Sequence, residues 1–227
     1  MPRVSRAEAE RSRRRVIDHT ARLIREKGAD QVSVPEAMAA AGLTHGGFYR
    51  HFASKDDLLA QALAAAFTER HEAMERLAEP AELAEPAEPA EPAEAPDPAG
   101  GPDAADPAGE PRAEAPGPAR PDRSPRQEFL HRYLSALHRD HPGQGCAAAA
   151  LAADAARAEP GAPLRTAYTA GLRDLLDGFA RLPDPADRQT ALADLSTMVG
   201  ALMLARASED PDLSADLLDA ARHRLSR

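Results

Sequence analysis

The sequence predicts an all-α protein, and three observations support this. Apolar residues recur at helical spacing in both halves of the chain, and no segment alternates with the period of two that is typical of a strand. Both halves are rich in Ala, Leu and Arg, which favour helices. Thirteen of the 21 prolines lie between residues 79 and 125. We therefore expect a helical head, a proline-rich intervening segment and a C-terminal helical bundle.

The intervening segment, 79–125, is acidic and poor in apolar residues. Glu-Pro-Ala recurs four times from residue 79 to residue 93, no aromatic residue occurs, and acidic side chains outnumber basic ones by 12 to 3. Such a composition buries too little apolar surface to offset the entropy of ordering. We predict a disordered acidic linker. Its simplest role is that of a spacer, and the alternatives are a docking tail or a decoy for the head's polyanionic partner.

Charge is distributed unevenly along the chain. Residues 1–55 carry 11 basic and 6 acidic side chains, although the whole chain has a formal net charge of −9. A basic head on an acidic chain indicates a polyanionic partner for the head alone.

Several function classes are disfavoured by what the sequence lacks. Its one cysteine, Cys146, excludes an internal disulfide framework and a multi-cysteine zinc module. No uninterrupted apolar run approaches the roughly 18 residues of a membrane span. The N-terminus has no apolar stretch behind its charges, so we expect a cytoplasmic protein. We find no catalytic constellation and no phosphate-binding glycine loop, and we predict neither an enzyme nor a cofactor. His131, His138 and His141 suggest metal binding. Only the first two are spaced to share a helix face, whereas His141 lies beside a proline in a loop, so we predict no metal site.

Four helices are expected in the head. The first spans about 7–27 and ends at Gly28. The second follows the capping pattern of Ser33 and Glu36, a third short helix covers 44–51 with Thr44 as its cap, and a fourth runs from Ser54 to about residue 77. Beyond the linker, helical patterns cover about 125–140, 146–158, 162–181, 185–208 and 212–225.

The second and third helices form a helix-turn-helix pattern. Two short helices at 34–41 and 44–51 flank the turn Ala41-Gly42-Leu43. In this motif the second helix enters the major groove of DNA with its N-terminal residues nearest the bases. Phe48 and Phe52 are four residues apart and are expected in the core, whereas Tyr49, Arg50 and His51 remain as polar donors. The head therefore predicts a DNA-binding domain.

Residues 11–63 resemble the N-terminal domain of the TetR/AcrR family of bacterial transcriptional regulators. The most specific signature is Tyr-x-x-Phe at 49–52 followed by Ser-Lys-x-x-Leu at 54–58. Further matching segments are Val16-Ile17 through Glu26-Lys27-Gly28, Val32-Ser33-Val34 and Ala40-Ala41-Gly42-Leu43-Thr44. The segment from His138 to Cys146 resembles a ligand-domain pattern found in part of that family, with less specificity.

The resemblance implies an all-helical homodimer that binds a palindromic operator and is released by a small-molecule effector. By position, it implies phosphate contacts for Ser33, Tyr49, His51 and Lys55. It implies contacts to base edges or nearby backbone for Thr44, His45 and Gly46. The long acidic insert departs from the short connection that the family has between its fourth and fifth helices.

These arguments divide the chain into a helix-turn-helix domain at 1–55, a connecting helix at 56–78, the linker at 79–125 and an effector-binding and dimerisation domain at 126–227. We expect dimerisation through the apolar faces of the last two long helices. The candidate effector-pocket residues, for which ordinary core packing is the alternative, are Phe67, His71, Met74, Phe129, Tyr133, Cys146 and Tyr168.

Other interpretations remain open at this point. The same scaffold is a redox or electrophile sensor if Cys146 reacts, although a small buried residue is the simpler interpretation of this cysteine. A helical protein-interaction module without DNA binding is a further alternative. An activator is possible in place of a repressor, since the choice depends on where the operator lies.

Overall fold

The computed structural model describes residues 6–78, 123–182 and 187–226. All regular elements in these ranges are helical, which confirms the predicted all-α fold. Residues 79–122, which make up nearly all of the predicted disordered linker, lie outside the described residues. The sequence places Ser124 and Pro125 in that linker as well, but here they begin a helix.

The head consists of α1 (Arg6–Lys27), α2 (Val34–Ala40), the 3-10 helix η1 (His45–Arg50) and the long helix α3 (Lys55–Ala78). The predicted inner face of α1 is buried, with Ile17, Thr20, Ala21 and Ile24 all under one tenth exposed. Gly28 ends α1 with a φ of +88°, a left-handed conformation that favours glycine.

Helix starts in the head follow the predicted caps in part. The Ser33 hydroxyl accepts from the Glu36 N–H, but the Glu36 carboxylate pairs with Lys27 instead of returning to the cap, so only half of the predicted capping box forms. At α3, the Ser54 hydroxyl accepts from the Asp57 N–H at 3.0 Å. The Asp57 carboxylate accepts in turn from the Ala53 N–H, and that hydrogen bond lowers the pKa of Asp57.

The C-terminal part contains α4 (Pro125–Tyr133), α5 (Ala136–Asp140), the short 3-10 helix η3 (Pro142–Gln144), α6 (Ala147–Arg157), α7 (Pro163–Arg181), α8 (Arg188–Ala207) and α9 (Pro211–Leu225). The prediction of a single helix over 125–140 is wrong, because the helix is interrupted between Tyr133 and Ala136. Ser135 causes the break: its hydroxyl donates to Arg132 O and caps α5 by accepting from His138 N–H.

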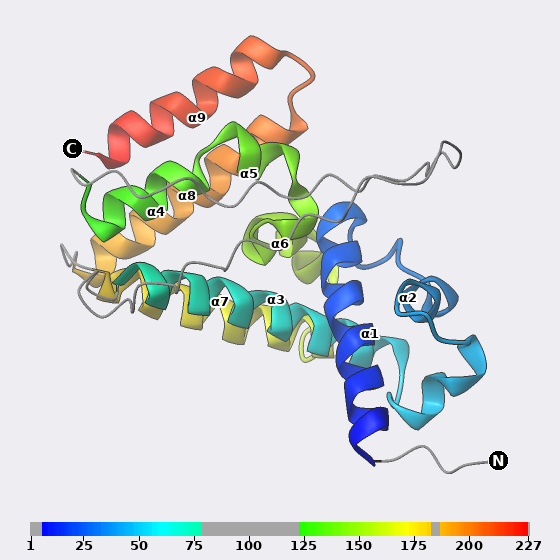
Figure 1. Cartoon of the computed structure of the whole chain (residues 1–227). Helices are drawn as coiled ribbons and strands as arrows, with labels where there is room; N and C mark the ends of the chain where they lie inside the picture. Colours follow the sequence, from blue (N-terminus) through cyan, green and yellow to red (C-terminus); the bar gives the residue numbers. More distant parts are fainter. Residues whose placement is uncertain (1–5, 79–122, 183–186, 227) are drawn as a thin grey trace, which may run out of the picture.

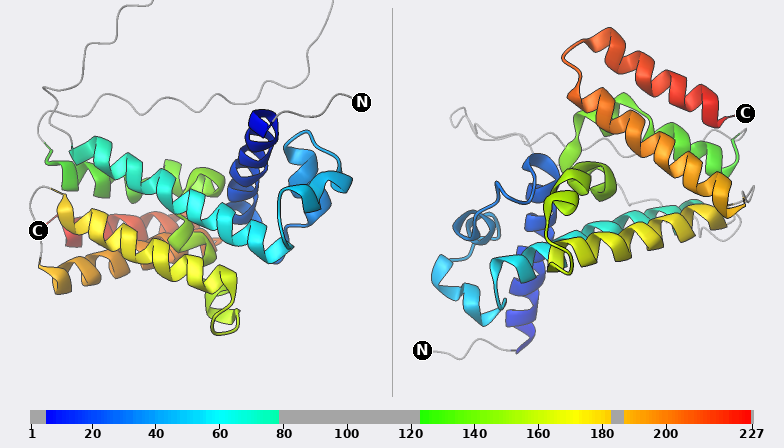
Figure 2. Two further views of the ribbon diagram at one scale, coloured as in Figure 1. Left: turned by 90° about the horizontal axis from the view of Figure 1, so that it is seen from below. Right: turned by 180° about the vertical axis from the view of Figure 1, so that it is seen from behind.

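α3 and α7 lie side by side and form the long axis of the molecule (Figures 1 and 2). α1 crosses one end of this pair, and α4, α8 and α9 are stacked over it (Figure 1). Gly171 and Gly178 of α7 permit the close approach. An added Cβ at Gly171 would overlap the Phe67 ring, and one at Gly178 would lie 2.7 Å from Met74 Cε. The α3–α7 contact therefore continues from the head into the C-terminal bundle.

Among the described helices, α8 alone is long and apolar enough to cross a membrane by length and mean hydropathy. In this fold the apolar side chains of α8 contribute to the core of the bundle. Leu195, Met198 and Leu202 pack into the bundle, while Leu192 and Leu204 lie on the opposite, exposed face. The two charged residues between positions 189 and 207 are both engaged inward, Asp194 with Arg126 and Arg206 with backbone carbonyls of the α5 region.

Candidate nucleic-acid interface

The predicted helix-turn-helix is present, and its turn is centred on Gly42. Gly42 has a φ of +71°, and its N–H donates to Ala39 O while Leu43 N–H donates to Met38 O. These bonds satisfy the last carbonyls of α2 and turn the chain sharply into Thr44. α2 and η1 lie together beside α1 at the end of the molecule farthest from the C-terminus (Figure 1).

The second helix of the motif, predicted over 44–51, is a six-residue 3-10 helix. Thr44 occupies the cap position, but its side chain makes no capping hydrogen bond. Gly46 and Gly47 account for the 3-10 form, because two adjacent glycines are poor formers of α-helix. A Cβ at Gly46 would meet nothing within 4 Å, so the backbone there is open to an approaching ligand.

The inner side of η1 is held by aromatic packing. Phe48 and Phe52 are both buried, and their rings stack with centroids 5.5 Å apart. Arg13 of α1 lies over the Phe52 ring, with its Cζ 5.7 Å from the centroid, and also binds Gln61 of α3. This arginine therefore contributes to the packing that supports η1.

The outer side carries the predicted DNA contacts. The Tyr49 side chain is 79% exposed although its ring edge packs on Phe48 at 5.2 Å. Ser33, Thr44, His45 and Gly46 are also exposed, and His51 is half-buried. Lys55 is half-buried too, and its ammonium donates to Asp30 O at 3.4 Å, so it links α3 to the loop after α1. Five of the seven residues predicted to contact DNA are therefore exposed, and the other two are half-buried.

Arg50 is a further candidate that the resemblance does not single out. It is exposed at the end of η1 and makes no ion pair with any described carboxylate. An exposed guanidinium is a group that proteins commonly use to contact DNA phosphates. Its position after Tyr49 was the sequence signal for it.

Comparisons with known proteins match the same region. A family model described as bacterial regulatory proteins, tetR family, matches residues 16–62. The HTH-type transcriptional regulator AcrR of Shigella flexneri is 36% identical over 61 residues, which is 27% of this chain and 28% of AcrR. The head of the chain therefore matches the TetR/AcrR family. Members of this family are DNA-binding transcriptional regulators, and the match to AcrR spans just over a quarter of that relative's length.

Solved structures share the whole fold. Reduced NemR of E. coli superimposes with a TM-score of 0.64 at 15% identity, covering 95% of both chains. A TetR-family regulator of Agrobacterium tumefaciens gives a TM-score of 0.60 at 16% identity, covering 95% of this chain and 98% of the other. At these identities the likeness concerns the fold alone, and it extends through the C-terminal bundle.

The candidate effector-pocket residues form two aromatic groups inside the bundle. Phe67 and Tyr168 meet edge to face at 5.8 Å, and the Tyr168 hydroxyl donates to Ala148 O. Phe129 and Tyr133 lie 5.8 Å apart, with Phe179 beside Phe129. His71 and Met74 pack against Gly178, and Cys146 is buried. None of the seven lines the large open cleft between α1, α6 and α8.

His138 organises the polar part of this interior. Its Nδ1–H donates to Tyr133 O at 2.6 Å, and its Nε2 accepts from Cys146 N–H at 2.9 Å. Burial, together with the nearby positive charge of Arg70, lowers the pKa of His138 to about 3. Both ring nitrogens are therefore occupied, and neither is available to a metal ion. Burial also raises the pKa of Tyr133, with a further contribution from Cys146.

Proposed function

We propose that this protein is a homodimeric transcriptional regulator that binds a palindromic operator through α2, η1 and the start of α3. The observation that carries the proposal is the two-sided construction of η1. Its inner side is anchored by Phe48 and Phe52, while Tyr49 and Arg50 stay exposed on an open, glycine-containing turn. An exposed phenol side chain on a rigid support adds little to the stability of the fold, and its hydroxyl can donate a hydrogen bond to a phosphate.

The assigned contacts are those that the resemblance implies and the structure leaves accessible. Ser33, Tyr49, His51 and Lys55 bind phosphates, and Thr44, His45 and Gly46 face base edges or nearby backbone. The basic head binds DNA although the whole chain is acidic. At 0.1 M salt, charges are screened over about 10 Å, so the DNA phosphates interact mainly with the nearby charges of the head.

The test is a salt titration of binding to DNA from immediately upstream of the protein's own gene, with an unrelated duplex as control. Arg50→Gln should weaken binding and reduce the slope of log K against log salt by about one. Arg173→Gln is the matched control, since Arg173 is exposed on α7 and lies outside the helix-turn-helix. Equal slopes for the two variants, or no preference for any sequence in a random-library selection, would contradict the proposal.

The proposed dimer interface is the exposed face of α8 together with α9. Leu192 and Leu204 of α8 are 44% and 59% exposed on this face, and Leu213 of α9 is 50% exposed. Apolar surface of this kind is usually covered in a stable protein. Pairing with a second copy would place two η1 helices on one DNA duplex, as an inverted repeat requires.

The proposed effector pocket is the interior bounded by Phe67, His71, Met74, Phe129, Tyr133, Cys146 and Tyr168. Two buried polar atoms support it: His71 Nδ1 has no hydrogen-bond partner among the described residues, and the Tyr133 hydroxyl has none beyond the Cys146 thiol. Unpaired buried polar groups are costly, and a ligand with a donor and an acceptor would satisfy them. Effector binding there would displace α3 relative to α7 and so move the head.

A redox sensor is the second candidate, and the position of Cys146 supports it. The thiol lies beside Tyr133 at the N-terminal end of α6, and its burial means that oxidation requires local opening. Hydrogen peroxide would convert the thiol to a sulfenic acid and release water. If Cys146 is the sensor, Cys146→Ser keeps DNA binding and loses the response to peroxide. If the trigger is a small-molecule effector, Cys146→Ser changes neither DNA binding nor the behaviour towards peroxide.

The match of the head to the TetR family also bears on the remaining expectations. TetR-family proteins are regulators and generally not enzymes, so a role in regulation takes precedence over catalysis here. The cytoplasmic location belongs to the same proposal. A protein-interaction module without DNA binding stays the alternative, and it predicts that Tyr49→Phe changes nothing.

A further inference from the structure

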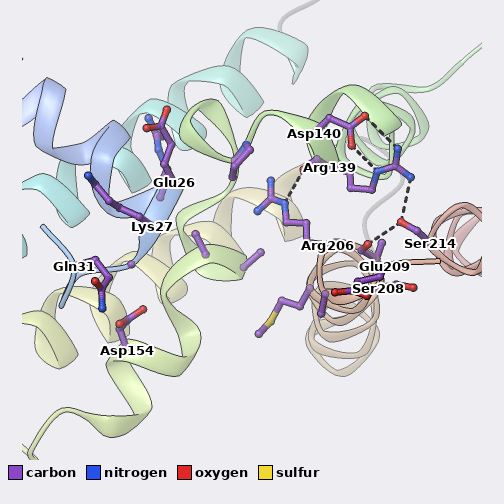
Figure 3. A pocket seen from close by; sticks show the side chains of 18 of the residues that line it. Glu26, Lys27, Gln31, Arg139, Asp140, Asp154, Arg206, Ser208, Glu209 and Ser214 are labelled. Atoms are coloured by element: carbon purple, nitrogen blue, oxygen red, sulfur yellow. Dashed lines mark hydrogen bonds and ion pairs between the residues drawn. The ribbon is translucent and has the colours of Figure 1, made fainter. Parts of the chain in front are cut away.

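An open cleft of about 940 Å³ lies between the head and the C-terminal bundle. One wall is the end of α1 and the loop after it, including Lys27 and Gln31. The opposite wall is the end of α8 and the start of α9, including Arg206 and Ser208, and α6 forms the floor (Figure 3). The cleft is thus separate from the aromatic interior, and any molecule that fills it touches both parts of the protein.

The cleft is lined by as many acidic as basic residues, and one of the basic residues has no carboxylate partner among the described residues. Five basic residues line it, and four of them have carboxylate partners. Arg25 pairs with Glu69 at 2.8 Å, Lys27 with Glu36, Arg139 with Asp140 at 2.7 Å and Arg157 with Asp154 at 3.2 Å. Arg206 has no ion pair with any described carboxylate. Asp140, the acidic residue of the cleft that acts electrostatically on Arg206, is held by two hydrogen bonds from Arg139.

The guanidinium of Arg206 is held on one edge and open on the other. Its Nε–H donates to Arg139 O at 3.1 Å, and Nη2–H donates to His138 O at 2.6 Å. Nη2 also packs on Gly145, where an added Cβ would lie only 2.6 Å away. A guanidinium has five N–H groups. No described residue accepts a hydrogen bond from Nη1 of Arg206, so this edge is open to a ligand. Figure 3 shows the group pointing into the cleft between the two walls.

The surroundings of Arg206 favour an anion. Burial has the largest effect on the pKa of Arg206 and lowers it; the positive charge of Arg70 lowers it further, while the negative charge of Asp140 acts in the opposite direction. Arg70 itself donates to Gln144 O, and it forms no ion pair with a described carboxylate. A half-buried cation beside a second unpaired cation is stabilised by a bound negative charge.

We propose that this cleft binds an organic carboxylate, whose carboxyl group pairs with the Nη1 edge of Arg206 and whose apolar body lies over Ala149, Ala150 and Met203. A planar bidentate pair is the geometry that a guanidinium forms best with a carboxylate. The volume lies within the range of small-molecule sites. Because α1 forms the facing wall, occupancy would hold the head against α8, and this regulatory consequence rests on the proposed function.

The test uses methionine methyl NMR on the full-length wild-type protein. The chain has five methionines, of which Met203 lines the cleft and Met74 lies in the aromatic interior. The probes are 2-naphthoate and octanoate, each compared with its neutral amide up to about 10 mM. We expect the carboxylates to shift the Met203 signal, assigned with Met203→Leu, and the amides to bind at least about tenfold more weakly.

A pair of variants tests the role of Arg206. Arg206→Gln should reduce carboxylate affinity by about tenfold, whereas the matched variant Arg157→Gln, which removes a paired and exposed charge of the same cleft, should change it by less than about twofold. Shifts at Met74 without Met203, equal shifts with the amides, or no shift with either carboxylate would overturn the proposal. The titration contains no DNA, so its failure is distinguishable from a failure of the DNA-binding proposal.

Discussion

The buried His138 predicts a specific dependence of stability on pH. The imidazole is neutral in the folded protein because Nε2 must accept from Cys146 N–H, and burial lowers its pKa to about 3. In the unfolded chain the same group titrates near 6.5. The unfolded state therefore binds more protons between these two values. Stability is fully present above pH 6.5 and is lost as the pH falls towards 3.

The magnitude follows from linkage. Between pH 7 and pH 5 the unfolded chain gains most of a proton at this position while the folded chain gains almost none, which costs about 2 kcal/mol of unfolding free energy. Over the complete window the loss approaches about 5 kcal/mol at 1.36 kcal/mol per pKa unit. Other histidines and carboxylates add their own pH dependence, so the comparison has to be made between matched proteins.

Urea unfolding of the wild type and of His138→Gln at both pH values, at one protein concentration, isolates this contribution. The glutamine side-chain carbonyl retains an acceptor for Cys146 N–H without a titrating ring. We expect the variant to be less stable at pH 7 and to lose about 2 kcal/mol less than the wild type on going to pH 5. Equal losses in the two proteins would refute the reasoning, as would an NMR titration in which His138 protonates near its unfolded value of 6.5.

Three further predictions concern packing, capping and assembly. Gly171→Ala should destabilise the protein by about 1–2 kcal/mol in calorimetry, because the overlap with Phe67 outweighs the better helix propensity of alanine; a higher melting temperature would contradict this. Ser54→Ala should cost about 1 kcal/mol by removing the cap of α3, and Ser54→Asp, which keeps an acceptor, should cost less. Leu204→Glu on the exposed face of α8 should convert the dimer to a monomer in light scattering with an unchanged helical circular dichroism spectrum; a variant that stays dimeric would place the interface elsewhere.

The sequence by itself determined the elements that depend on local physics. Helical periodicity and caps predicted the inner face of α1, the stop at Gly28 and the Ser54 start of α3, because each involves residues within a turn or two of one another. The buried Phe48 and Phe52 and the exposed Tyr49 followed from their spacing on one short helix. The family resemblance rests on the same compact motif.

Tertiary structure decided what depends on residues distant in the chain. η1 is a 3-10 helix because its glycines weaken an α-helix while Phe48 and Phe52 hold it against the head. No local pattern shows that Gly171 admits the ring of Phe67 from a helix about one hundred residues earlier. Likewise, Arg206 is one of 28 basic residues in the sequence, and only the folded chain leaves it without a described carboxylate partner in a cleft. Side-chain pairing of this kind is set by packing between helices, and sequence spacing carries no information about it.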